Sequence, residues 1–276
     1  MRLACPQQDV RDRVRNCYAA FLSPPHAEPD FRLRIHRPPA SPRKRSGPTQ
    51  WAAAEEHPRL RQEGDRLRVQ RCDFDADFDL GAATGGVTCR RGGVLTGIES
   101  ALRICYSVLA VLHDGLILHA AGIARNGRGY VFAGPSGAGK STIAGLCSPA
   151  ERVLSDELVV VRRSGTAFHV HGTPFRGTSN APPRAEAAAL EGVYFPVKDR
   201  NAYVRPAPRT AAVRNLLACA LAFGQTADYA DRLLSNVFAL VDAVPNAYLH
   251  FAKRPDFWRL LGRQDAAGTE GKAERT

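Results

Sequence analysis

A stretch in the middle of the chain combines glycines, a lysine and hydroxyl side chains at a spacing that can bind phosphate. Gly134 is followed by four residues and then by Gly139-Lys140-Ser141. Glycines let the backbone adopt positive φ and bring its N–H groups close to phosphate oxygens. Lys140 can reach the β- and γ-phosphates, and the Ser141 hydroxyl can ligate Mg²⁺. We therefore expect a site for ATP and Mg²⁺ formed by Gly134, Pro135, Ser136, Gly137, Ala138, Gly139, Lys140, Ser141 and Thr142. The alternative is a glycine-rich turn with a surface lysine.

The sequence on either side of this stretch predicts a strand before it and a helix after it. Tyr130-Val131-Phe132 is apolar, aromatic and β-branched, which favours a strand. Residues 140–147 can form a helix that Pro149 prevents from continuing. The start of such a helix directs N–H groups and a positive dipole end at the same anion.

Two carboxylates follow shortly after this predicted helix. Asp156 and Glu157 come at the end of a short apolar strand, Arg152–Leu154. An acid at this place can hold Mg²⁺ or take the proton from an attacking hydroxyl. Because adjacent residues of a strand point to opposite faces, we assign the catalytic role to Asp156 and a metal-related or structural role to Glu157. The alternative for Asp156 is a helix or turn cap.

Three further side chains are candidates for the site. His119 lies within the apolar strand predicted over residues 116–124, where a core histidine is the alternative. His171 and Arg176 lie in a loop after a predicted strand, where residues that contact ligands concentrate. Arg176 could stabilise charge on the transferring phosphoryl group, with a plain surface arginine as the alternative. We place His171 on the side of the phosphoryl acceptor.

The strand that precedes the phosphate-binding stretch is predicted to have an antiparallel neighbour. Asn126-Gly127 separates the apolar runs 116–124 and 130–132, and Asn-Gly between two such runs is a strong hairpin signal. An ordinary phosphate-loop domain uses parallel strands joined by helices instead. We therefore expect an α/β fold with a mixed, largely antiparallel sheet.

Three motifs in this order resemble the catalytic domain of HPr kinase/phosphorylase. They are Leu118-His119-Ala120-Ala121-Gly122, the stretch 134–142, and Leu154-Ser155-Asp156-Glu157. The chain is most similar to the HPr-kinase-related serine kinases of bacterial gene clusters, over roughly residues 66–260. The later segments 171–175, 244–245 and 257–258 are also similar to those relatives.

This resemblance implies a phosphate-loop fold shared with phosphoenolpyruvate carboxykinase and an ATP- and Mg²⁺-dependent kinase activity. The acceptor implied is a hydroxyl, usually of a serine in a protein or peptide. Asp156 then corresponds to the proton acceptor, and His119 corresponds to the motif histidine. The chain has Asp156-Glu157 where HPr kinases carry two aspartates, and it lacks the Arg-Gly-Leu-Gly-type signature associated with dephosphorylation. A nucleotide-binding regulatory module without phosphotransfer and a small-molecule kinase remain alternatives.

Amino-acid composition and hydrophobic pattern divide the chain into four segments. We expect an N-terminal helix within residues 1–22, a basic Pro-rich linker over 23–65, the catalytic domain over 66–262 and a disordered tail over 263–276. Alternation over residues 67–79 predicts strands. Helices are predicted at 98–112, 211–223 and 228–242, and a last strand is predicted at 248–251.

Composition limits the classes of partner and compartment. The net charge is +11 in 276 residues, but only five of the 38 basic residues are lysines. Such arginine dominance indicates compositional bias, so nucleic acid is not an expected partner. The seven cysteines are scattered without a CxxC pair, which argues against a zinc site or a disulfide framework. Without a signal peptide or an 18-residue apolar run, we expect a cytoplasmic protein with no membrane contact. A homo-oligomer is compatible with the sequence.

Overall fold

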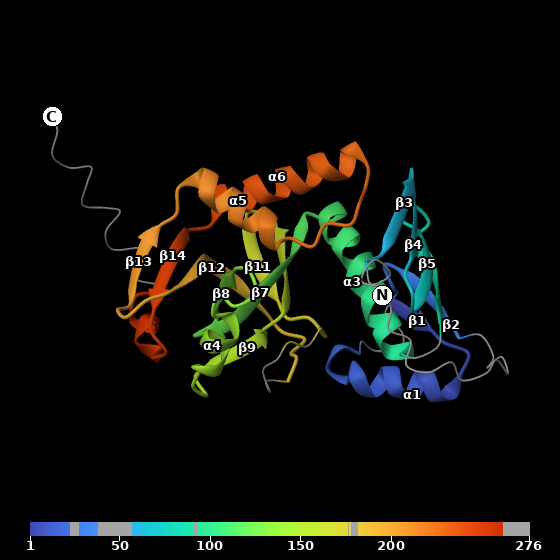
Figure 1. The fold of residues 1–276 in the computed structure, drawn as a ribbon, viewed down its shortest axis with the longest axis horizontal. Helices are drawn as coiled ribbons and strands as arrows, with labels where there is room; N and C mark the ends of the chain where they lie inside the picture. Colours follow the sequence, from blue (N-terminus) through green and yellow to red (C-terminus); the bar gives the residue numbers. More distant parts are fainter. Residues whose placement is uncertain (23–27, 38–56, 91–92, 176, 178–181, 262–276) are drawn as a thin grey trace. The chain divides into compact units, whose positions relative to one another are not determined.

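The computed structural model describes residues 1–22, 28–37, 57–90, 93–175, 177 and 182–261 (Figure 1). The chain forms two compact units. The N-terminal unit contains Met1–His113 and Ala222–Leu233, and the C-terminal unit contains Asp114–Leu221 and Leu234–Thr276. The catalytic domain predicted over residues 66–262 therefore includes parts of both units.

The N-terminal unit is built on a six-stranded mixed sheet. In spatial order its strands are β1 (Arg2–Ala4), β2 (Arg32–His36), β6 (Thr84–Cys89), β5 (Phe74–Asp79), β4 (Arg66–Gln70) and β3 (Arg59–Glu63). The β1–β2 and β2–β6 pairs are parallel, and the other pairs are antiparallel.

Alternation along the strands gives this sheet one buried and one solvated face, as the sequence predicts for residues 67–79. Phe74 and Phe78 are fully buried, whereas the intervening Asp77 forms an ion pair with Arg66 of β4 at 3.0 Å. Helix α3 (Val94–Leu112) packs against β5 and β6, and α1 (Gln8–Cys17) lies next to α3 (Figure 1). A short 3₁₀ turn, Ala19–Phe21, follows α1.

Helix α3 is long and apolar enough to cross a membrane by length and composition, although the sequence analysis predicted no such segment. Half of its apolar window is buried inside the protein. Packing of residues such as Ile98 and Leu102 against the rest of the fold accounts for this apolar composition, as expected for a core helix.

The N-terminal part of the chain differs from the predicted arrangement of a helix and a linker. Strand β1 precedes α1, and strands β2 and β3 lie within the range 23–65, for which a linker was predicted. Strands β1 and β2 pair with distant partners, for example Arg32 with Thr84 in β6, which the local Pro-rich composition does not indicate, whereas β3 forms a hairpin with β4. Residues 23–27 and 38–56 of the predicted linker, and the predicted disordered tail over residues 263–276, lie outside the described residues.

The C-terminal unit is built on an eight-stranded mixed sheet. Its strands follow the spatial order β11 (Ala167–His171), β10 (Leu158–Ser164), β7 (Gly115–Arg125), β8 (Arg128–Ala133), β12 (Ala187–Lys198), β14 (Asn246–Phe251) and β13 (Tyr203–Pro206), with β9 (Glu151–Ser155) also paired to β7. Strand β11 pairs with both β10 and β12, so that β11, β10, β7, β8 and β12 form a closed ring. Strand β12 runs parallel to β8 and β14, and the other pairs are antiparallel. The fold class is thus α/β with two mixed, largely antiparallel sheets.

The predicted hairpin between β7 and β8 is confirmed. Arg125 pairs with Arg128 across the turn, and Asn126 and Gly127 both have positive φ, at 51° and 77°. Positive φ at both central residues is the geometry that favours Asn-Gly in a two-residue hairpin. This turn sets the register that places Ala120 of β7 opposite Ala133 at the end of β8.

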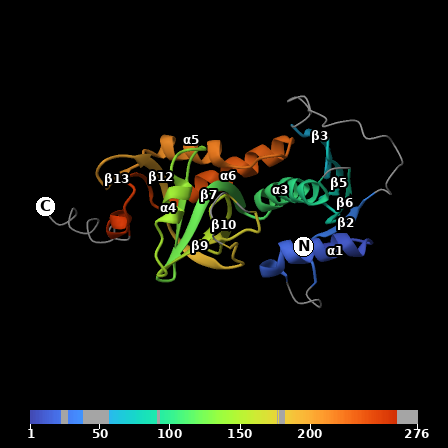
Figure 2. The same cartoon turned by 60° about the horizontal axis from the view of Figure 1, so that its bottom comes forward.

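Two helices, and a third from Leu234 on, belong to the same unit as this sheet. Helix α4 (Lys140–Gly145) follows β8, α5 (Arg209–Cys219) contacts β7, β8 and β14, and α6 (Ala227–Ala243) precedes β14. Figure 2 shows α5 lying along the eight-stranded sheet. Helix α5 ends at Cys219, not at the predicted residue 223, because Ala220 forms a bridge with Leu118 and the Leu221 N–H donates to the Ile117 carbonyl at 2.9 Å.

An aromatic core supports the end of β8 and the start of α4. Phe132 packs edge-on against Phe257 and Trp258 of the final 3₁₀ helix (Pro255–Arg259), at centroid distances of 6.4 and 5.9 Å. Ile143 of α4 and Phe251 of β14 belong to the same cluster. The residues that carry the chemistry of the 134–142 stretch are therefore attached to a rigid base.

Candidate functional site

The 134–142 loop runs from the end of β8 into α4, and its geometry explains its glycines. Gly137 and Gly139 have φ of 80° and 111°, values that side-chain-bearing residues rarely adopt. A Cβ at Gly139 would also lie 2.7 Å from Cζ of Phe251. Residues 135–137 are exposed, so the peptide groups at the outer part of the loop can reach a ligand from solvent.

The Lys140 side chain is directed back along this loop. Its Nζ donates to the carbonyl oxygens of Gly134 and Pro135 at 2.8 and 3.0 Å, and the residue is only 6% exposed. Burial lowers the pKa of the ammonium, and the neighbouring Cys219 and Glu157 act in the opposite direction. The two carbonyl oxygens hold this positive charge at the loop, where it can pair with an anion that the loop binds.

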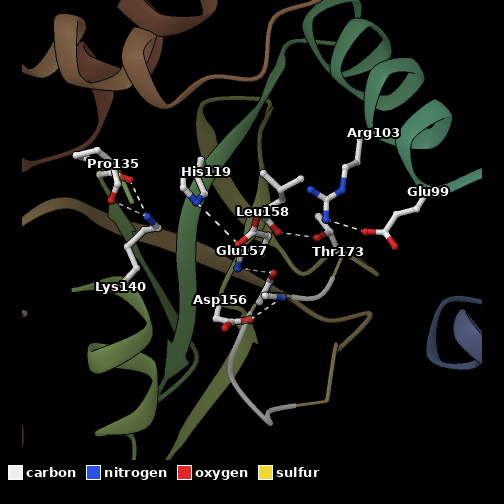
Figure 3. A network of polar contacts seen from close by, with 12 residues as sticks. Glu99, Arg103, His119, Pro135, Lys140, Asp156, Glu157, Leu158 and Thr173 are labelled. Atoms are coloured by element: carbon white, nitrogen blue, oxygen red, sulfur yellow. Dashed lines mark hydrogen bonds and ion pairs between the residues drawn. The ribbon is translucent and has the colours of Figure 1, made fainter. Parts of the chain in front are cut away.

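The two predicted carboxylates lie at the junction of β9 and β10, next to β7. The Ala120 N–H of β7 donates to the Glu157 carbonyl at 3.2 Å, which fixes the junction beside the His119 segment. The Glu157 carboxylate lies 3.9 Å from Nε2 of His119, with both side chains 31% exposed. Figure 3 shows Glu157, His119 and Lys140 in one neighbourhood. The structure therefore brings three sequence-predicted residues together.

Asp156 has a different environment from Glu157. It is 6% exposed, and its Oδ1 accepts a hydrogen bond from the Gly177 N–H at 3.3 Å (Figure 3). A Cβ at Gly177 would lie 2.7 Å from Oδ2 of Asp156, so glycine is required for this close approach. Asp156 and Glu157 lie between β9 and β10 and not within a strand, so the predicted strand alternation does not apply to them, although the two carboxylates do have different partners.

His171 was predicted in the loop after a strand, and the structure places it in the strand itself. His171 is partly buried at the end of β11, and burial lowers its pKa, with His169 and Arg162 lowering it further. Its described interactions are thus with His169 and Arg162 and not with Lys140 or Asp156. Two residues further on, the Thr173 hydroxyl donates to the Leu158 carbonyl at 2.6 Å and ties this segment to the carboxylate junction. Arg176 lies outside the described residues.

The oxygen donors available suit a magnesium ion better than a transition metal. Among the described residues no group of three or more His, Cys, Asp or Glu side chains is placed to hold a metal ion. Ser141 on the first turn of α4, Asp156 and Glu157 supply oxygens only. Mg²⁺ commonly uses one or two carboxylates and takes its other ligands from water and substrate phosphates, so this donor set fits it.

Sequence reasoning missed three residues that shape the site. Phe251 packs against Gly139, Gly177 holds Asp156, and Cys219 places a buried thiol close enough to Lys140 for each to shift the pKa of the other. All three lie far along the chain from the residues they contact, so no local pattern could reveal them. For Gly177 alone the sequence held an indirect signal, since this glycine directly follows the candidate Arg176 in a Gly/Pro-rich loop.

Comparisons with known proteins identify the family of this chain. No curated protein was found to match it. A family model described as SynChlorMet cassette protein ScmC matches residues 91–263, which is well over half of the chain and includes every candidate site residue. The chain therefore belongs to the ScmC family of SynChlorMet cassette proteins.

Proposed function

We propose that this protein is an ATP- and Mg²⁺-dependent kinase that transfers the γ-phosphoryl group to a hydroxyl, most simply a serine of a protein or peptide in the cytoplasm. One observation carries the proposal. The buried Lys140 ammonium, held by the first two residues of a glycine-rich loop, lies close to Glu157 and beside the strand that carries His119. Phosphoryl transfer requires this combination of a phosphate cradle, a fixed cation and carboxylates.

The loop and Lys140 would hold the polyphosphate. Residues 134–142 present peptide N–H groups and the Ser141 and Thr142 hydroxyls, and Lys140 neutralises charge on the β- and γ-phosphates. Ser141, Asp156 and Glu157 would hold Mg²⁺, which supplies charge neutralisation between the terminal phosphates when bound. His119, whose Nε2 lies next to the Glu157 carboxylate, would keep that carboxylate in position.

Asp156 is the residue proposed to accept the proton of the acceptor hydroxyl. The acceptor oxygen forms a bond to the γ-phosphorus, the bond from that phosphorus to the bridging oxygen breaks, and ADP leaves with the electron pair. The hydroxyl proton moves to the Asp156 carboxylate. The Gly177 N–H fixes this carboxylate. His171 and Arg176, the residue directly before Gly177 in the sequence, are proposed to shape the acceptor side.

The resemblance to HPr kinase/phosphorylase supports the same conclusion by a separate route. Its three motifs fall on the middle of β7, the 134–142 loop and the β9–β10 junction. Ala120 contacts both the β8 end and the Glu157 carbonyl through backbone pairing, so the three motifs are adjacent in the sheet. A shared fold with phosphoenolpyruvate carboxykinase is part of this proposal.

The test is the transfer of label from γ-labelled ATP in the presence of Mg²⁺ and an extract of the source cells. We expect a labelled acceptor with wild-type protein and none with Lys140→Ala or Asp156→Asn. Asp231→Asn, an exposed aspartate on α6, serves as the matched control and keeps the activity. ATP affinity must persist in Asp156→Asn and fall in Lys140→Ala.

Two results would contradict the proposal. If Lys140→Ala transfers phosphate as fast as the wild type, the loop is not the phosphate site. If wild-type protein binds ATP tightly but labels no protein, peptide or small molecule in the extract, a regulatory nucleotide-binding module is the better description.

A further inference from the structure

A cavity of about 320 Å³ opens beside the first residues of the 134–142 loop, within the C-terminal unit. Gly134 and Pro135 form its wall on the loop side. Phe195 of β12, Tyr248 of β14 and Asn215 of α5 line the remainder, together with neighbouring apolar residues. The same Gly134 and Pro135 carbonyls hold the Lys140 ammonium, so the cavity adjoins the proposed phosphate site directly.

Backbone register places this cavity and the carboxylates on opposite sides of the loop. Ala120 bonds to Glu157 on one side and pairs with Ala133 of β8 on the other. Beyond β8, Tyr194 pairs with Phe132, which puts Phe195 beside Ala133, and Phe195 pairs with Tyr248. At this level of the sheet, the row of neighbouring backbone segments therefore runs from the carboxylate junction through β7, β8 and β12 to β14.

This row excludes the phosphoryl acceptor as the occupant of the cavity. Neighbouring strands are about 4.8 Å apart, so Phe195 and the carboxylate junction, three strands apart, are separated by roughly 14 Å. A hydroxyl bound against Phe195 and Tyr248 is therefore too far from Asp156 to give it a proton. If the terminal phosphate faces the carboxylates, the other end of the nucleotide must extend across β8 towards β12 and β14.

The walls of the cavity have the chemistry that a flat heterocycle needs. The rings of Phe195 and Tyr248 lie 5.8 Å apart between centroids, and Pro196 and Val197 add apolar surface. Asn215 donates from Nδ2 to the Tyr248 hydroxyl at 3.3 Å and offers its amide oxygen as an acceptor. A volume of about 320 Å³ is at the small end of ligand sites and suits one ring system better than a whole nucleotide.

We propose that this cavity holds the nucleobase of the bound nucleotide and that Asn215 recognises the donor and acceptor edge of adenine. A carboxamide can pair with the N6 amino group and N7 of adenine at the same time, whereas the corresponding atoms of guanine, O6 and N7, are both acceptors. This inference rests on the proposed function, since it requires the phosphates to bind in the 134–142 loop.

The experiment compares ATP with inorganic tripolyphosphate, which has the phosphates but no base. Ala218 is exposed on α5 and lines the cavity, so Ala218→Trp fills the space without disturbing the core. Ala211→Trp, on the same helix but outside the cavity lining, is the control. Affinities measured by calorimetry should show ATP weakened at least tenfold by Ala218→Trp, with tripolyphosphate and the control unchanged.

A second variant tests the recognition of adenine. Asn215→Leu should reduce the ratio of ATP to GTP affinity about tenfold and leave tripolyphosphate binding within twofold of wild type. If Ala218→Trp weakens ATP and tripolyphosphate equally, or if neither variant changes ATP binding, the nucleobase assignment is wrong while the proposed phosphate site stands. If tripolyphosphate binding does not depend on Lys140, the proposed function fails and this inference fails with it.

Discussion

Replacement of Gly139 by alanine should destabilise the C-terminal unit strongly, for two separable reasons. The residue has φ of 111°, and its Cβ would lie 2.7 Å from Cζ and 3.2 Å from Cε1 of Phe251. Phe251 is 2% exposed within the aromatic core and has little room to retreat. The substitution therefore imposes both backbone strain and overpacking.

The two contributions can be estimated separately. A left-handed backbone conformation costs a residue with a side chain about 1–2 kcal/mol, and overpacking a core costs about 1–3 kcal/mol. We therefore expect Gly139→Ala to lower the free energy of unfolding by about 2–5 kcal/mol. Gly137 has φ of 80°, but a Cβ at this position would meet no atom within 4 Å, so Gly137→Ala carries the backbone cost alone.

The measurement is urea unfolding followed by tryptophan fluorescence. Trp258 is 4% exposed in the C-terminal unit, and a Trp51→Phe background makes it the sole reporter. A double-mutant cycle with Phe251→Leu should recover the overpacking part and leave the backbone part. If Gly139→Ala and Gly137→Ala are equally destabilising, or if Phe251→Leu gives no recovery, Phe251 does not constrain this loop.

Two further predictions concern Asp156 and His171. Gly177→Ala would place a Cβ 2.7 Å from the Asp156 carboxylate, so it should lower the transfer rate at least tenfold with ATP affinity nearly unchanged. The control is Gly145→Ala, because a Cβ at Gly145 would meet open space. Equal transfer rates for the two variants would contradict the role of Gly177. Because burial lowers the pKa of His171 below its ordinary value of 6.5, the unfolded chain binds the proton more readily, and stability should be full above pH 6.5 and fall as the pH decreases below it. His171→Gln should lose less stability than wild type between pH 7.5 and 5.0 in urea titrations, and equal losses would show that His171 does not cause the pH dependence.

Local sequence patterns predicted many elements because the signals are short-range. The alternation of Phe74, Ala76 and Phe78 with aspartates gave β5, and Asn126-Gly127 gave the β7–β8 hairpin. These patterns depend on side-chain direction and turn geometry within a few residues. Strands β1 and β2 escaped prediction because their pairing partners are distant, and β3, which forms a hairpin with β4, because its surroundings are rich in Arg and Pro.

The candidate site was predictable only in part for the same reason. The sequence by itself determined the phosphate-binding residue types of the 134–142 stretch, the pair Asp156-Glu157 and their order along the chain, because glycine, lysine and carboxylate chemistry depends on residue identity and spacing. Only the tertiary structure decided that Glu157 lies near His119 and Lys140, that Asp156 is held by Gly177, and that Phe195, Asn215 and Tyr248 form a cavity beside Gly134. These contacts arise from strand pairing and from the packing of α5, which join residues that are far apart in the sequence, and no local pattern specifies such long-range pairing.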